Sequence, residues 1–115
     1  MRELHYGSSV LITSFDVCQE IFNYSLALLA TKTQAVVEVP VVVRGFAATS
    51  NVLLGIPVPL HCEPSSEDEL DLDDAGFVAR LRSETAALQR FGARLRDATP
   101  VHQVAFDYDR DFAEV

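Results

Sequence analysis

The sequence predicts a single α+β domain in which two helices cover one face of an antiparallel sheet. Two observations carry this prediction. Several short segments alternate apolar and polar residues with a period of two, and two longer segments repeat apolar residues with helical spacing. Along the chain these segments read strand, helix, strand, strand, helix, strand. The length of 115 residues suits one domain spanning 1–115, and 49% hydrophobic with 23% charged residues is ordinary globular composition.

The first strand and helix are predicted at residues 9–13 and 15–31. The strand is a short β-branched run that begins two residues after Gly7, and Ser14 or Thr13 can cap the free N–H groups of the following helix. Apolar residues cover an arc of roughly 200° around this helix, which is wider than one packing surface needs. We therefore expect a second helix or another subunit to cover part of it.

The next two segments predict a β-hairpin. Valines alternate through residues 36–44, where Pro40 favours an edge position, and a second alternating run covers residues 52–62 after a connection at 45–50. Pro57 and Pro59 remove two N–H donors from the same edge of that second run. The run is therefore either an edge strand near its end or an extended arm that leaves the sheet.

The remaining segments predict an acidic surface linker at 63–75, an amphipathic helix at 77–98 and a last strand at 101–109. The resulting β-α-β-β-α-β order matches the ferredoxin-like arrangement. In that topology the third strand is central, which conflicts with Pro57 and Pro59. A related antiparallel sheet with the 52–62 strand at an edge is therefore the alternative.

The net charge of −8 comes almost entirely from residues 61–75, the linker and the two residues before it, which hold seven acids and no base. Nucleic-acid binding and attachment to an anionic membrane both call for clustered Lys and Arg, so neither partner is expected. No signal-peptide pattern opens the chain, and we expect a cytoplasmic protein in which Cys18 and Cys62 are reduced and buried. A disulfide or a reactive thiol is the alternative. Eight arginines against one lysine suit a GC-rich bacterial genome.

No motif for catalysis, cofactor or metal binding emerges, so we expect no cofactor and lean away from an enzyme. Asp71, Asp73 and Gly76 match three positions of a calcium loop, but Arg82 occupies the position of its bidentate glutamate. Consecutive residues on a strand point to opposite faces, so His61 and Cys62 cannot converge on one ion without a turn. Glu84 lies in the apolar arc of the second helix, where it pairs with Arg80 or across a subunit interface.

The function predicted is a small non-catalytic protein that acts through homo-oligomerisation, with a dimer favoured, or through protein–protein interaction. The interface candidates are apolar residues on the first helix and the hairpin: Phe22, Leu26, Leu29, Val36, Val42 and Phe46. The alternative is a small-molecule-binding domain or cofactor-free enzyme with a pocket between sheet and helices. Its polar candidates are His5, Tyr6, Tyr24, His61 and His102.

Overall fold

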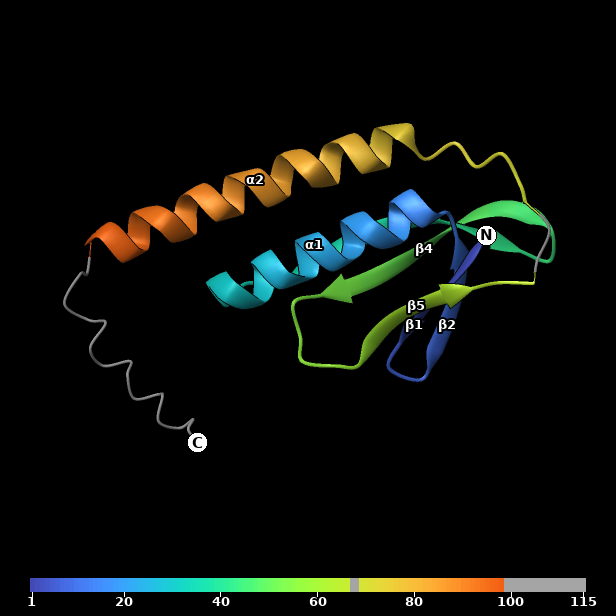
Figure 1. The fold of residues 1–115 in the computed structure, drawn as a ribbon, viewed down its shortest axis with the longest axis horizontal. Helices are drawn as coiled ribbons and strands as arrows, with labels where there is room; N and C mark the ends of the chain where they lie inside the picture. The colour runs from blue at the N-terminus through green and yellow to red at the C-terminus, as the bar shows by residue number, and fades with distance from the viewer. Residues whose placement is uncertain (67–68, 99–115) are drawn as a thin grey trace.

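A computed structural model describes residues 1–66 and 69–98 of the chain, and within them it shows a five-stranded antiparallel sheet and two helices (Figure 1). The elements are β1 (Arg2–Tyr6), β2 (Ser9–Thr13), α1 (Phe15–Thr31), β3 (Ala35–Val43), β4 (Phe46–Leu54), β5 (Leu60–Pro64) and α2 (Ala75–Ala98). The strands lie in the order β4-β3-β2-β1-β5. The α+β class is therefore confirmed.

The helix α1 has the predicted bounds because its two ends are capped. The Ser14 hydroxyl accepts a hydrogen bond from the Val17 N–H at 3.1 Å. At the other end Lys32 adopts a left-handed conformation (φ 56°), and its N–H donates to the last carbonyls of the helix. α2 packs along α1, and the two helices run in the same direction (Figure 1).

The predicted hairpin is present as β3 and β4, but its turn is shorter than predicted. Arg44 (φ 52°) and Gly45 (φ 82°) form a two-residue connection with positive φ at both positions, as tight hairpin turns require. Residues 46–50, which the sequence assigns to the connection, therefore belong to β4. Phe46 lies opposite Val43 as the first pair of the ladder.

The predicted strand 52–62 was wrong as a single element. β4 ends at Leu54, and β5 begins at Leu60 on the opposite edge of the sheet. Pro57 and Pro59 lie in the connection between the two strands, so their missing donors interrupt no ladder. Gly55 opens this connection with a φ of 98°.

Pro40 does not mark a sheet edge, because β3 lies between β4 and β2. The ladder between β2 and β3 consists of the single register pair Ile12 and Val42. The Thr13 hydroxyl donates to the Pro40 carbonyl at 2.6 Å, so this side of Pro40 faces β2 just beyond the ladder. The missing N–H of Pro40 thus falls where the two strands have separated.

The strand β1 was not predicted, although it lies between β2 and β5 near the middle of the sheet. Leu4 is its single fully buried apolar residue (1% exposed), so its sequence shows little alternation. This added strand and the observed order leave the ferredoxin-like topology unconfirmed. The predicted last strand, with His102, lies outside the described residues.

The linker is shorter than predicted, because β5 extends to Pro64 and α2 begins at Ala75. Leu72 in the linker is buried, and the Glu69 carboxylate contacts the Met1 amino group. The core forms where α1 and the first turns of α2 meet the sheet, around Val17, Ile21 and Leu81. In the part of the chain that the structure describes, no helix has the length and apolar character needed to cross a membrane.

Candidate functional site

Three of the predicted interface residues lie together in an apolar groove beside α1. Phe22, Leu26 and Leu29 form its helical side, and the connection between β4 and β5 forms the other side. We call this site the α1 groove, and it has a volume of about 210 Å³. Its lining residues, none of which carries a formal charge, are Tyr6, Phe22, Ser25, Leu26, Leu29, Gly55, Ile56, Val58 and Leu60.

The groove exists because α1 has more apolar surface than the domain covers. Ile21 and Leu28 are buried in the core, whereas Leu26 is 65% exposed and Leu29 is 44% exposed. α2 covers a different side of α1, through contacts such as the Tyr24 hydroxyl with Glu84. The wide apolar arc predicted for this helix thus meets the sheet and α2 and still leaves a third, open side.

A buried polar group adds to this groove. Ser25 is 8% exposed, and its hydroxyl lacks a hydrogen-bond partner among the described residues. A buried hydroxyl without a partner is uncommon in native proteins and costs about 1–3 kcal/mol. The Ser25 oxygen has almost no accessible surface, so this cost belongs to the packing of α1 and is not a contact offered to a partner.

The other predicted interface residues do not join the groove. Val36 (67% exposed) and Phe46 (76% exposed) are accessible but belong to the β3–β4 hairpin. Val42 is 7% exposed, because it lies opposite Ile12 where β2 and β3 meet, so it is not available to a partner. The predicted set therefore divides between the α1 groove, two separate exposed positions at opposite ends of the hairpin, and one buried position.

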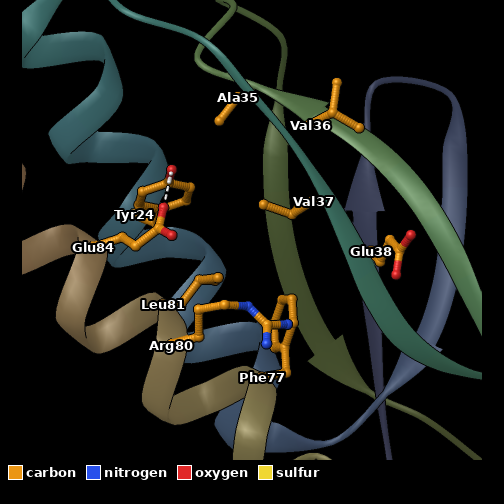
Figure 2. Close-up of a pocket in the computed structure, with 9 residues that line it drawn as sticks. All are labelled: Tyr24, Ala35, Val36, Val37, Glu38, Phe77, Arg80, Leu81 and Glu84. Carbon is orange, nitrogen blue, oxygen red and sulfur yellow. Dashed lines mark hydrogen bonds between the residues drawn. The ribbon is translucent and has the colours of Figure 1, made fainter.

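A second concave site lies between α1, α2 and β3, where the sequence analysis placed its alternative pocket (Figure 2). This interhelical cleft has a volume of about 420 Å³, within the range of small-molecule sites. Of the pocket candidates from the sequence that fall within residues 1–66 and 69–98, Tyr24 is the one that lines it. The lining residues are Tyr24, Ala35, Val36, Val37, Glu38, Phe77, Arg80, Leu81 and Glu84.

Two polar features organise the interhelical cleft. The Tyr24 hydroxyl donates to Glu84 Oε1 at 3.0 Å, and the Arg80 guanidinium lies 5.8 Å from the centre of the Phe77 ring. Burial, followed by the hydrogen bond and the negative charge of Glu84, raises the pKa of Tyr24 to about 12. The sequence analysis predicted that Glu84 pairs with Arg80 or across a subunit interface. In the structure Glu84 instead accepts a hydrogen bond from Tyr24 of the other helix.

A charged pair joins the helices on their other flank. Glu20 is 5% exposed, and its Oε2 accepts a hydrogen bond from Arg82 Nε at 2.8 Å. This bond and the charge of Glu20 raise the pKa of Arg82. Because its carboxylate is paired, Glu20 can be buried at the interface between the helices.

The cysteines lie together as free thiols in the core. Cys18 is 2% exposed and contacts the half-buried Cys62 of β5. Burial raises the pKa of Cys18 well above its usual range, and the contact with Cys62 adds to the shift. A thiolate nucleophile is therefore disfavoured at this position, although it is near the start of a helix.

The remaining described pocket candidates lie in the α1 groove and on the strands β1 and β5. Tyr6 lines the α1 groove, and its hydroxyl donates to the Leu53 carbonyl. His5 and His61 lie opposite each other on β1 and β5.

No protein-family model matches the sequence, and neither a curated protein nor a solved structure shows significant similarity to it.

Proposed function

We propose that this chain acts through protein–protein interaction and that it forms a homodimer through the α1 groove. The observation that carries this proposal is the exposed apolar ridge of Leu26 and Leu29 beside a groove whose lining bears no formal charge. Exposed apolar surface rimmed by polar residues is typical of interaction sites. A twofold axis near Leu26 would place the ridge of each copy over the groove of the other.

The charge of the chain restricts where a second copy can bind. At a net charge of −8, two copies repel each other at long range, and this repulsion is least unfavourable where the surfaces that meet carry no acidic residues. The α1 groove is such a surface. A stable dimer buries about 1,200–2,000 Å² in total, so the contact must extend from the groove along the exposed side of α1.

The substitution Leu26→Glu tests this proposal. It places a charge at the centre of the interface while keeping a good helix former, and we expect the dimer to dissociate. The matched control is Ser83→Glu, which adds the same charge at an exposed position of α2, a helix with no residue among those that line the groove. Analytical ultracentrifugation at micromolar concentration measures the mass. A monomeric parent protein, or an L26E variant that dimerises like the parent, would contradict the proposal.

The interhelical cleft supports a second function, the binding of a small molecule. Glu38 and Glu84 give it two carboxylates and Arg80 gives it one positive charge, and its size fits an amino-acid-sized or larger ligand. Zwitterionic amino acids are therefore suitable probes for chemical-shift mapping by NMR. Binding would move the signals of Phe77, Arg80 and Leu81, and the variant Arg80→Gln should weaken it.

A further inference from the structure

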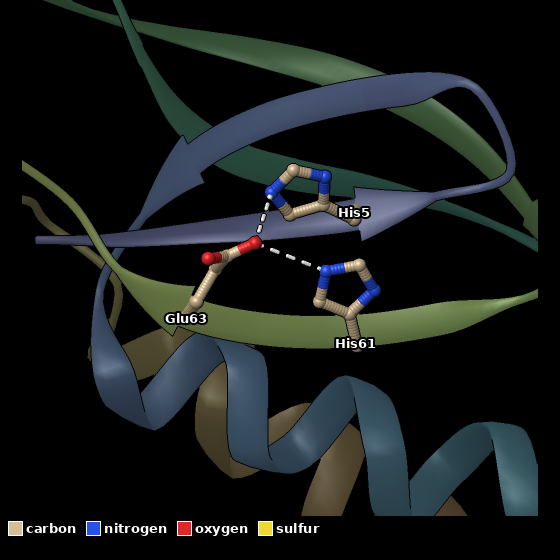
Figure 3. A group of neighbouring side chains, drawn as sticks. All are labelled: His5, His61 and Glu63. Atoms are coloured by element: carbon tan, nitrogen blue, oxygen red, sulfur yellow. Dashed lines mark hydrogen bonds and ion pairs between the residues drawn. The ribbon is translucent and has the colours of Figure 1, made fainter.

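The open face of the sheet carries a cluster of two histidines and a glutamate that neither function above uses (Figure 3). His5 belongs to β1, and His61 and Glu63 belong to β5. Leu4 and Cys62, one residue away on these strands, face the core, so the cluster points away from the helices. We propose that His5, His61 and Glu63 form a binding site for a divalent transition metal ion of the zinc type.

The spacing of the ligand atoms fits this ion. His5 Nε2 and His61 Nε2 each lie 3.1 Å from Glu63 Oε2, and one ligand atom from each residue lies within 4.8 Å of the others. Ligands bound at about 2.0–2.2 Å to a tetrahedral zinc lie about 3.3–3.6 Å apart. Small side-chain rotations are therefore enough to admit the ion, with the imidazole protons moved to Nδ1. Two imidazoles and one carboxylate are also a ligand set that zinc uses in proteins.

The charges around the cluster provide an independent argument. Glu3 and Glu63 lie directly opposite each other on β1 and β5, and like charges in this position destabilise a sheet. Glu3 Oε1 also lies 3.1 Å from His5 Nε2. A bound cation would be attracted by both carboxylates and would remove the repulsion between them. Glu3 thus favours the metal by its charge, without being one of the three proposed ligands.

The exposure of the ligands shows how the ion would be held. The side chains of His5, His61 and Glu63 are 24%, 61% and 49% exposed. The fourth coordination position therefore faces solvent. Because the ligands come from adjacent strands, the ion would tie the edge strand β5 to β1 without being needed for the core to form.

Calorimetric titration of untagged, chelator-treated protein with Zn²⁺ tests the proposal. We expect one ion per chain and a melting temperature that rises by several degrees in excess zinc. The variants His61→Asn and Glu63→Gln should each lower the affinity by at least about tenfold, and Glu3→Gln should weaken it less. The matched control is Asp71→Asn, which removes an exposed carboxylate from the segment between β5 and α2 and should leave binding unchanged.

Two further measurements make the test specific. Ca²⁺ and Mg²⁺, which prefer oxygen ligands, should not bind at comparable concentration. The Co²⁺ complex should show d–d absorption without a thiolate charge-transfer band, since no sulfur is among the ligands. Three results would each overturn the proposal: absence of zinc binding to the parent protein, a zinc affinity of H61N or E63Q equal to that of the parent protein, or a thiolate charge-transfer band in the Co²⁺ complex. Because these side chains are partly exposed, the variants should fold, and circular dichroism of the metal-free proteins checks this.

Discussion

The proton of the Tyr24 hydroxyl makes the stability of the contact between the two helices depend on pH. The hydroxyl donates to Glu84, and burial with the charge of Glu84 raises the pKa of Tyr24 from 10.0 to about 12. Below pH 10 the folded and unfolded chains both hold this proton, so its contribution to stability is complete. Between pH 10 and 12 the unfolded chain loses the proton while the folded chain keeps it, and the free energy of unfolding falls as pH rises.

The substitution Tyr24→Phe isolates this contribution. We expect the variant to be less stable than the parent at pH 9, with a difference that shrinks as the pH approaches 12. Urea unfolding at several pH values measures both proteins, and Tyr6 titrates in both, so it cancels in the comparison. A stability difference that stays constant from pH 9 to 12 would show that the hydrogen bond to Glu84 does not control the proton.

The two thiols should differ in reactivity. Cys18 is buried and its pKa is raised, whereas Cys62 is half-buried at the edge strand. Since the thiolate is the reactive form, iodoacetamide should modify Cys62 first in the folded protein and reach Cys18 at a comparable rate only in denaturant. Mass spectrometry of the peptides distinguishes the sites. Equal labelling of the two cysteines in the native protein would mean that α1 separates readily from β5.

At the level of elements, prediction from sequence succeeded where local signals were strong. α1 has a capping serine and helical periodicity, and its bounds are those predicted. β3 shows clear alternation, and it is present in the structure. β1 was missed because Arg2, Glu3, His5 and Tyr6 leave it a single apolar core residue, and its position is determined by pairing with β2 and β5.

The connection between β4 and β5 depends on one glycine. Gly55 has a φ of 98°, and an added Cβ would lie 2.3 Å from the Thr33 carbonyl oxygen. We expect Gly55→Ala to lower the free energy of unfolding by about 2–4 kcal/mol, through backbone strain together with this clash.

Two glycines serve as controls for that substitution. Gly45 also has positive φ (82°), but an added Cβ meets nothing within 4 Å, so Gly45→Ala should cost about 1 kcal/mol from strain alone. Gly76 is in α2 with open space around it, and Gly76→Ala should be neutral or slightly stabilising. Urea denaturation gives all three values. If Gly55→Ala cost no more than Gly45→Ala, the close approach to Thr33 would be unimportant.

At the level of the whole molecule, the sequence predicted only part of each candidate site. The apolar arc of α1 identified Phe22, Leu26 and Leu29, but the opposite wall of the α1 groove comes from residues 55–60, whose fold depends on Gly55 and two prolines. His5 and His61 were predicted only as separate pocket candidates, and their meeting with Glu63 was missed for a related reason. Ligand spacing rules search within one element, whereas His5 and His61 come from strands that are far apart in the sequence.

The net charge of the molecule predicts how the proposed dimer responds to salt. Two copies that each carry −8 repel each other, while the α1 groove between them contributes apolar contact without charge pairs. Raising the ionic strength from about 0.01 M to 0.1 M shortens the screening length from about 30 Å to about 10 Å and weakens the repulsion. The dissociation constant of the dimer should therefore decrease with added NaCl, and sedimentation equilibrium at several salt concentrations measures it.

A dimer held by ion pairs across its interface would show the opposite trend, because screening weakens attraction between unlike charges. The variant Ser83→Glu sharpens the comparison, since it adds one negative charge per copy on α2, away from the residues that line the groove. Its dimer should be weaker than the parent dimer at low salt and approach it at high salt. A dimer that dissociates as salt is added would place the contact on a charged surface and contradict the assignment to the α1 groove.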